Sequence, residues 1–275
     1  MTEQESIRVD DVAALVLAAG KGTRMKSDLP KVLLKAAGQS LLERVLLILQ
    51  TAGIRRTCLV LGGDLEPFND LLQRYPDLPV CRQVQRRGTG DAAASAAPGF
   101  TGVTPPSWSA GELLRGTPLT SAAILICYGD TPCLQPTVIG DFITTCQREE
   151  SRIGVLGMRH PNPTGYGRLV LDEEGRLEEI VEEKDADDRI RRIDLCNSGI
   201  VYAATDFLFH LLARLTPENA QKEYYLTDCF RLAREEGAPA TVYITDDYRS
   251  FDGVNDPVQL AAAEELLKET GRAVP

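Results

Sequence analysis

The stretch Val12-Ala-Ala-Leu-Val-Leu17, with Ala18-Ala-Gly20-Lys-Gly22 directly after it, decides which fold we expect for this chain. The first segment contains no charge, follows Asp10 and Asp11, and runs into a loop that contains glycine. A short apolar run of this kind is typical of a strand that is buried on both faces of a parallel sheet. We therefore expect a buried strand and a close turn at the start of an α/β protein.

Strand and helix patterns alternate over the next part of the chain. Ser40 can cap a helix whose apolar positions run from Leu41 to Leu49, and Gly53 lies where a helix often ends in a left-handed glycine. The alternation continues with a strand over 57–61, a helix over 91–97, a buried strand over 124–127 and a helix from Pro136. This order predicts a mainly parallel sheet flanked by helices, with ligands at the carboxyl ends of its strands.

The second half of the chain has a different pattern. Arg168–Leu171 and Arg176–Val181 flank the turn Asp172-Glu-Glu-Gly175, which predicts a small β-hairpin subdomain. A strand over 195–203, a helix over 226–236 and a last helix from Asp256-Pro257 are expected to follow. Residues 99–120 are rich in Pro, Gly, Ser and Thr, so we expect them to form an irregular surface insertion.

Composition limits the classes of function. The chain has 275 residues, a formal net charge of −10 at pH 7 and 43% hydrophobic residues. These values describe an ordinary globular protein and exclude a generally basic binder of nucleic acids or anionic membranes. We expect a single domain over 12–270, preceded by a tail over 1–11.

The cysteines and the first apolar run indicate the compartment. The seven cysteines are scattered and never form a C-x-x-C pair, so we expect reduced thiols. The first apolar run is too short to span a membrane and lacks a basic leader. These features predict a cytoplasmic protein and leave its oligomeric state open.

Positive charge is concentrated in the loop after the first strand. Residues 20–35 contain five basic side chains and one acidic one, whereas residues 172–188 contain ten acidic and two basic side chains. Backbone N–H groups after a buried strand can approach a phosphate chain, and Arg24 and Lys31 bring cations to it. The segment is neither a Walker A loop nor a G-x-G-x-x-G fingerprint. Glycines alone are also compatible with a tight turn, but the local charge favours a polyphosphate cradle.

Further segments carry side chains suited to ligands. They are Gln83-Val-Gln85-Arg-Arg-Gly88-Thr89-Gly90, Tyr128-Gly129-Asp130, Gly165-Tyr166-Gly167-Arg168, Val181-Glu182-Glu-Lys184-Asp185, Asn197-Ser-Gly199, Asn219-Ala-Gln221-Lys-Glu223-Tyr224-Tyr225-Leu-Thr227-Asp228 and Phe251-Asp-Gly-Val-Asn255. A side-chain amide offers a donor and an acceptor to a base, a carboxylate at a strand end suits Mg²⁺, and carboxylates with amides suit a polyhydroxyl ligand. Taken alone, these segments are also compatible with a helix cap, a turn and a solvated acidic face.

These motifs occur in the order found in the sugar-phosphate nucleotidyltransferases. From about Val12 to Glu264, the chain most closely resembles the uridylyltransferase (pyrophosphorylase) domain of the bacterial bifunctional N-acetylglucosamine-1-phosphate uridylyltransferases. The resemblance implies a Rossmann-like nucleotidyltransferase (GT-A-like) fold. It also implies Mg²⁺-dependent in-line attack of N-acetylglucosamine 1-phosphate on the α-phosphate of UTP, which yields UDP-N-acetylglucosamine and pyrophosphate.

The resemblance assigns roles to individual residues. It implies catalytic roles for Arg24, Lys31 and Asp130, with Mg²⁺ on Asp130 and Asn255. The residues implied in nucleotide binding are Leu17, Ala18, Ala19, Gly20, Lys31, Gln83, Gly88 and Thr89. Those implied in sugar binding are Tyr128, Gly129, Gly167, Glu182, Asn197, Tyr225 and Thr227.

Some features depart from the family pattern. Asp91 stands where relatives commonly carry His, and the insertion over 99–120 is not typical. The sequence ends within about a helix after Glu264, so we expect neither a left-handed β-helix nor acetyltransferase activity.

Other functions stay open at this point. The nearest alternative is the same chemistry on another pair, such as glucose 1-phosphate with UTP or dTTP, or cytidylyl or guanylyl transfer. A non-catalytic nucleotide-sugar sensor is another. A metal-dependent glycosyltransferase shares the broad fold, but Tyr128-Gly129-Asp130 lacks the first aspartate of a D-x-D motif.

Overall fold

The expected first strand forms the centre of the sheet. In a computed structural model that describes residues 11–20 and 22–271, β1 (Val12–Ala18) is buried at every position. It pairs in parallel with β4 (Arg56–Leu61) on one side and β7 (Ala123–Tyr128) on the other, and β4 pairs in parallel with β5 (Val80–Gln83). These strands place their carboxyl ends along one edge, where α/β proteins bind ligands.

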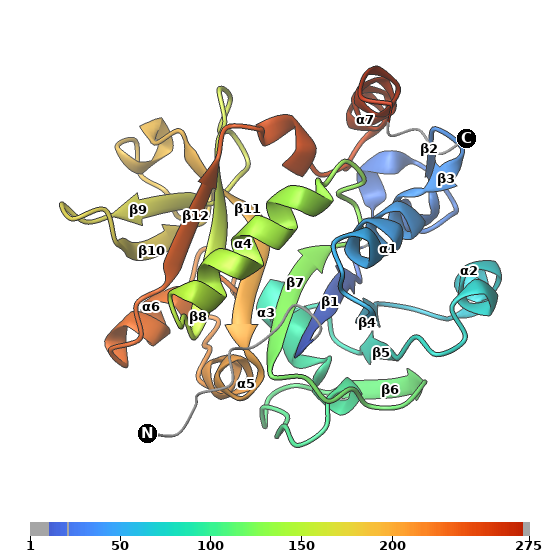
Figure 1. The fold of residues 1–275 in the computed structure, drawn as a ribbon, viewed down its shortest axis with the longest axis horizontal. Helices are drawn as coiled ribbons and strands as arrows, with labels where there is room; N and C mark the ends of the chain where they lie inside the picture. The colour runs from blue at the N-terminus through green and yellow to red at the C-terminus, as the bar shows by residue number, and fades with distance from the viewer. Residues whose placement is uncertain (1–10, 21, 272–275) are drawn as a thin grey trace.

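Further strands, most of them paired in antiparallel fashion, extend this parallel centre to ten strands within the described residues (Figure 1). β6 (Gly111–Arg115) lies antiparallel to β5, and β11 (Leu195–Ala204) lies antiparallel to β7. The remaining strands are β8 (Ile153–Arg159), β9 (Arg168–Leu171), β10 (Leu177–Val181) and β12 (Thr241–Thr245). β9 and β10 form the predicted hairpin beside β11, so the fold is the expected α/β fold with a mixed sheet flanked by helices.

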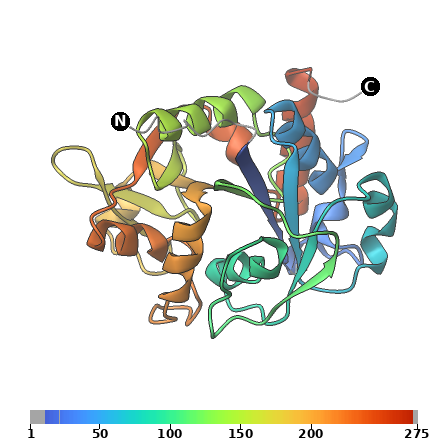
Figure 2. The ribbon, with the colours of Figure 1, turned by 60° about the horizontal axis from the view of Figure 1, so that its bottom comes forward.

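Helices cover both faces of the sheet (Figures 1 and 2). One face carries α1 (Leu41–Thr51), α2 (Asn69–Arg74) and α4 (Pro136–Arg148). The opposite face carries α3 (Thr89–Ala94), α5 (Thr205–Ala213) and α6 (Asp228–Glu235). α7 (Pro257–Glu269) packs near the short strands β2 (Lys35–Ala36) and β3 (Gln39–Ser40). Within the described ranges, every helix lacks the length or the apolar character that a bilayer-crossing segment needs.

The predicted helix starts and ends are confirmed at three positions. The Ser40 hydroxyl accepts a hydrogen bond from the Glu43 N–H at 3.2 Å, and the Asp256 carboxylate accepts one from the Gln259 N–H at 2.9 Å. Gly53 has a φ of 90°, the left-handed conformation expected after α1. Short 3-10 helices complete the element set: η2 (Thr23–Met25), η3 (Lys31–Leu33), η4 (Glu66–Phe68), η5 (Ala97–Gly99), η6 (Ile190–Arg192) and η7 (Tyr248–Phe251).

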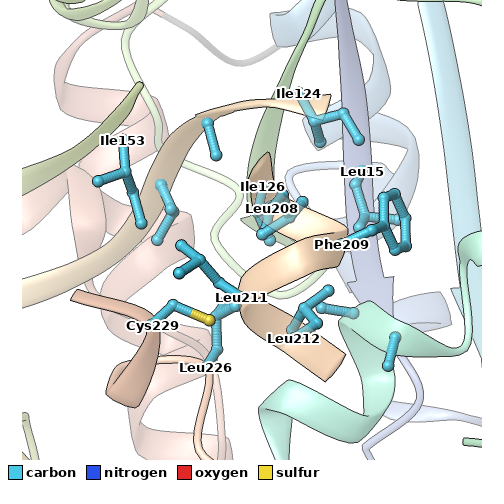
Figure 3. Close-up of a cluster of buried hydrophobic side chains, with 14 of the residues drawn as sticks. Leu15, Ile124, Ile126, Ile153, Leu208, Phe209, Leu211, Leu212, Leu226 and Cys229 are labelled. Carbon is cyan, nitrogen blue, oxygen red and sulfur yellow. The ribbon is translucent and has the colours of Figure 1, made fainter. Parts of the chain in front are cut away.

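Alternate residues of β1 belong to two hydrophobic cores. Leu15 faces the core that α5 and α6 cover, where Figure 3 shows it near Phe209 and Ile124. Val16 faces the core that α1 and α4 cover. Each fully buried side chain of this size contributes about 1.5–3 kcal/mol of hydrophobic stabilisation. The strand that leads into the loop over 20–35, which we call the phosphate loop because of the charge pattern of its sequence, is therefore held from both faces.

The segment over 99–120 differs from the expected irregular insertion. It contains β6, which forms the edge of the main sheet beside β5. Its two ends are joined because the Thr101 N–H donates to the Leu119 carbonyl at 2.8 Å. The strand was missed because its partner, β5, is distant in sequence and its own residues lack an alternating apolar pattern. Residues 1–10 of the expected tail lie outside the described residues.

Candidate active site

The loop after β1 turns back so that Lys31 lies beside its beginning. Gly22 has a φ of 59°, and a Cβ there would lie 2.6 Å from the Cβ of Lys31, so only glycine fits. Met25 is buried and its N–H donates to the Gly22 carbonyl at 3.0 Å, which anchors the loop. Arg24 and Lys26 remain exposed on it. Lys21, part of the positive charge expected here, lies outside the described residues.

One cavity of about 440 Å³ lies at the carboxyl ends of β1 and β5, and we call it the loop cavity. All eight residues expected to bind the nucleotide line it: Leu17, Ala18, Ala19, Gly20, Lys31, Gln83, Gly88 and Thr89. Arg86, Val32, Ala92, Tyr128, Asp130 and Glu223 complete the lining. Much of this wall comes from the phosphate loop and the turn before α3.

A second cavity of about 400 Å³, the hairpin cavity, lies toward β9, β10 and β11. Five of the residues expected to bind the sugar line it: Tyr128, Gly167, Glu182, Asn197 and Tyr225. Arg24 and Asn255 also line it. Its wall is rich in carboxylate, amide and hydroxyl groups from segments far apart in the sequence.

The two cavities meet at four residues. Thr89, Tyr128, Asp130 and Glu223 line both. Asp130 follows β7 directly, so the carboxyl end of a central parallel strand positions its side chain at this junction. The residues expected to bind a nucleotide and those expected to bind a sugar are therefore adjacent, and the carboxylates of Asp130 and Glu223 lie between them.

Asp130 and Asn255 direct their oxygens at a single cation. The Lys31 ammonium donates to Asp130 Oδ2 and, at 2.8 Å, to Asn255 Oδ1. The Asn255 amide also donates to the Gly253 carbonyl at 3.2 Å, which fixes its oxygen toward Lys31. The Val254 N–H donates to the Asp130 carbonyl at 2.9 Å and joins the two segments.

This oxygen pair fits the chemistry of Mg²⁺. The ion takes oxygen ligands, is commonly held by one or two protein groups, and completes its shell with waters and substrate phosphates. Asp130 and Asn255 supply a carboxylate and an amide oxygen that already converge on a positive charge. Within the described ranges, no three His, Cys, Asp or Glu side chains come together as a metal site.

The side chain of Gln83 contacts Asp91, which forms an ion pair with Arg87. The sequence did not predict this contact. Its amide nitrogen donates to Asp91 Oδ2 at 2.8 Å and to the Gly88 carbonyl at 3.3 Å. Arg87 Nη2 donates to the other oxygen of Asp91 at 3.0 Å. The expectation that Gln83 offers a donor and an acceptor to a base is therefore corrected, because its two N–H hydrogens already have acceptors.

Gly88 allows the loop before α3 to approach the segment before α6. It has a φ of 108°, and a Cβ there would lie 2.5 Å from the Tyr224 carbonyl oxygen. The Tyr224 N–H donates to the Arg87 carbonyl, and the Gly90 N–H donates to the Tyr224 carbonyl, each at 2.7 Å. These contacts tie the two cavities together.

Glu182 is a half-buried acidic group of the hairpin cavity wall. Burial raises the pKa of its carboxyl, and the hydrogen bond from Thr227 at 2.9 Å opposes part of that rise. Nearby acidic side chains raise the pKa further. Burial also raises the pKa of Tyr225 to about 12, so its hydroxyl stays protonated and donates its hydrogen to Asp185 Oδ2 at 3.1 Å.

Two expected sugar contacts do not line either cavity. Thr227 is buried and lies behind Glu182, whose Oε1 it contacts. Gly129 faces the core, where a Cβ would lie 3.1 Å from the Cβ of Ala18. Their placement indicates that Thr227 positions Glu182 and that Gly129 contributes to packing.

Other lining residues carried no expected role. Glu223 lies at the junction, Tyr166 and Gln221 line the hairpin cavity, and Arg86 lines the loop cavity. All of them occur within the motifs quoted from the sequence. Proximity to an assigned residue was the available signal, but only the folded geometry distinguishes lining residues from their neighbours.

Comparisons with known proteins agree with this arrangement. A family model described as "MobA-like NTP transferase domain" matches residues 14–194. The chain is 37% identical over 260 residues to "Bifunctional protein GlmU" of Pelobacter propionicus, which covers 94% of this chain and 53% of that protein. The chain thus spans about half the length of the curated relatives it matches.

Solved structures show the same fold. The inositol-1-phosphate CTP transferase from T. maritima has a TM-score of 0.68 at 16% identity, over 98% of this chain and 99% of that one. A UDP-glucose pyrophosphorylase has a TM-score of 0.72 at 17% identity, over 94% of this chain and 98% of that one. Since the family match over 14–194 includes the central strands, the phosphate loop and the turn that holds Gln83, the chain belongs to the family of MobA-like NTP transferase domains.

Proposed function

We propose that the protein transfers a uridylyl group from UTP to N-acetylglucosamine 1-phosphate, releasing pyrophosphate and forming UDP-N-acetylglucosamine. The observation that supports this most strongly is the junction of the two cavities at Asp130. A nucleotide in the loop cavity and a sugar phosphate in the hairpin cavity would bring their phosphates together there. Holding two reactants in this way supplies a large part of the catalysis of a group transfer.

The chemistry needs little beyond positioning and charge. A phosphate oxygen of the sugar 1-phosphate attacks the α-phosphorus of the nucleotide, and the bond from that phosphorus to the bridging oxygen of pyrophosphate breaks. The attacking group is already an anion, so no side chain has to remove a proton from it. Arg24 and Lys31 stabilise the negative charge on the transferring and leaving phosphates.

Asp130 and Asn255 would hold Mg²⁺ together with phosphate oxygens of the substrates. When bound, the ion neutralises phosphate charge and helps to align the reacting groups. In this structure the Lys31 ammonium lies on the same two oxygens, which shows that this position attracts positive charge.

The walls of the two cavities suit the two substrates. Backbone groups over 17–20 and Lys31 suit the triphosphate, and Gln83 with the Gly88-Thr89 pair suits the base. On the other side, Glu182 and Asn197 suit sugar hydroxyls and the acetamido group. The Tyr225 hydroxyl of that wall donates to Asp185, so it offers the sugar an acceptor.

A pyrophosphate-release assay across nucleotides and sugar 1-phosphates tests the proposal. We expect the highest kcat/KM with UTP and N-acetylglucosamine 1-phosphate, dependent on Mg²⁺. A higher kcat/KM with glucose 1-phosphate or dTTP would assign a different pair of substrates to the protein. Tight binding of a nucleotide sugar without any pyrophosphate release would contradict the proposal in favour of a sensor.

A further inference from the structure

We propose that Asp91 is a positioning residue that determines which bases the loop cavity accepts. Asp91 fixes the side-chain amide of Gln83, so that only the carbonyl oxygen of Gln83 faces the base. The site therefore selects a base with a ring N–H, such as uracil or thymine, over cytosine. This inference rests on the proposed function, because it takes the loop cavity as the nucleotide site.

The orientation of the Gln83 amide follows from its neighbours. Its nitrogen has two acceptors, Asp91 Oδ2 at 2.8 Å and the Gly88 carbonyl at 3.3 Å. An ion-paired carboxylate and a backbone carbonyl have no hydrogen to donate, so neither can pair with the amide oxygen. A flipped amide would place its oxygen against two other oxygens. Gln83 lines the loop cavity, and Oε1 is its remaining polar atom.

Asp91 is itself held in place. It is only 1% exposed, and both of its oxygens accept hydrogen bonds: Oδ1 from Arg87 Nη2 at 3.0 Å, and Oδ2 from Gln83. The Arg87 N–H approaches Oδ2 as well, at 3.4 Å. A buried carboxylate with these partners cannot rotate without leaving a donor unpaired, which is costly in the protein interior.

An aromatic pair restrains the guanidinium that holds Asp91. The rings of Trp108 and Tyr224 stack at 3.9 Å with an interplanar angle of 5°. The Arg87 guanidinium lies 5.7 Å from the Trp108 ring centre and 5.1 Å from that of Tyr224, and it donates to the Trp108 carbonyl. The segment over 99–120 therefore acts on the base site through Arg87 and Asp91.

The consequence for the base is a difference at one ring nitrogen. Uracil and thymine carry a hydrogen on N3, which can donate to a carbonyl oxygen, whereas N3 of cytosine is an acceptor. With N3 opposite Gln83 Oε1, as we propose, cytosine would place two acceptors against each other, and its 4-amino group could donate to this oxygen only if the base shifted. A mismatched base contact of this kind costs about 10- to 100-fold in affinity.

The substitution Asp91→Asn tests the inference. Asparagine keeps the size and an oxygen for Arg87, but its NH2 can donate to Gln83 Oε1, so the Gln83 amide can adopt both orientations. We expect the wild-type protein to bind UTP about 10- to 100-fold more tightly than CTP by calorimetry. In Asp91→Asn this ratio should fall at least tenfold, with any change for UTP in KM and not in kcat.

Two further variants keep the test decisive. Arg87→Gln, which weakens the hold on Asp91, should lower the UTP-to-CTP ratio in the same direction by a smaller factor. Asp141→Asn, an exposed carboxylate on α4, should leave the ratio unchanged. Thermal unfolding shows that each variant is folded.

The outcomes separate this inference from the proposed function. An unchanged ratio in a folded Asp91→Asn protein, or a wild-type protein that binds CTP as tightly as UTP, would overturn the role of Asp91. The wild-type protein could instead prefer UTP and lose that preference in Asp91→Asn, yet release no pyrophosphate with any sugar phosphate. That result would support the role of Asp91 and contradict the proposed function.

Discussion

The loop cavity and the hairpin cavity are built in different ways. The loop cavity owes much of its wall to consecutive residues over 17–20 and to the turn over 83–89, both at the ends of parallel strands. The hairpin cavity combines the segments over 164–167 and 197–199 with side chains from the end of β7, with Glu182 after β10 and with the segment before α6. The loop cavity depends mainly on the conformation of two strand ends, whereas the hairpin cavity depends on how more numerous distant segments pack.

The two cavities also differ in the charged side chains that line them. The loop cavity is lined by the cations Lys31 and Arg86, while the acidic side chains of the hairpin cavity include the half-buried Glu182. The two walls share the acidic side chains of Asp130 and Glu223. Substitutions at the junction should therefore affect both substrates, and those in one wall should affect mainly one.

Asp130→Asn should have the largest effect. The change removes one of the two carboxylates that both cavities share, the one that lies on Lys31, and we expect kcat in the pyrophosphate-release assay to fall by about 1,000-fold or more. Calorimetry should also show weaker Mg²⁺ binding. Asp28→Asn, an exposed change on the phosphate loop, should leave both unchanged. A fully active Asp130→Asn protein would exclude Asp130 as an essential group.

Arg24→Ala should have the next largest effect. Arg24 belongs to the phosphate loop but lines the hairpin cavity, so it can act on phosphates from either side. We expect kcat to fall by about 100- to 1,000-fold, as when one preorganised donor is lost. Lys26→Ala, two residues away and exposed, serves as the matched control. If kcat were the same in both variants as in the wild type, Arg24 would have no part in the transfer.

Glu182→Gln should affect the KM of one substrate much more than that of the other. The amide cannot replace a carboxylate that accepts hydrogen bonds from sugar hydroxyls, so KM for the sugar 1-phosphate should rise about tenfold. KM for UTP should stay within about twofold, because Glu182 does not line the loop cavity. A similar rise in both KM values would show that the cavities do not act separately.

The same variant makes a prediction about stability. The folded protein raises the pKa of Glu182, so its contribution to stability is fully present below the ordinary pKa of a glutamate and is lost as pH rises through the raised value. At neutral pH Glu182→Gln should therefore unfold at a temperature about 1–3 °C higher than the wild type. The gain should shrink toward acidic pH. Glu179→Gln, exposed on β10 just before Glu182, should show neither effect.

Ionic strength should have the smallest effect. Salt screens the attraction between the cations of the phosphate loop and a triphosphate, so KM for UTP should rise about two- to fivefold between about 50 and 300 mM salt. KM for the less charged sugar 1-phosphate should change less. A KM for UTP that is indifferent to salt would count against the positive charge over 20–35 as a determinant of binding.

The loop cavity was more accessible to sequence reasoning than the hairpin cavity. The apolar strand and glycines at 12–22 indicate a buried strand and a close turn, and the residues assigned to the nucleotide all line one cavity. The same reasoning placed Gly129 and Thr227 at the sugar, although one faces the core and the other lies behind Glu182. A motif identifies a neighbourhood, but the direction of each side chain depends on tertiary packing.

Side-chain networks were the least predictable part. Asp91 was visible only as a departure from a pattern, because its contact with Gln83 depends on the rotamers of both residues. The stacking of Trp108 on Tyr224 joins segments more than a hundred residues apart. The edge strand β6 was missed for the same reason, since its pairing with β5 is set by the folded sheet.

A crystal structure of the protein with UDP-N-acetylglucosamine and Mg²⁺ tests the two-cavity account most directly. We predict electron density for the base beside Gln83 and Gly88, for the sugar beside Glu182 and Asn197, and for the diphosphate beside Asp130. A sugar in the loop cavity, or a diphosphate remote from Asp130, would contradict the account.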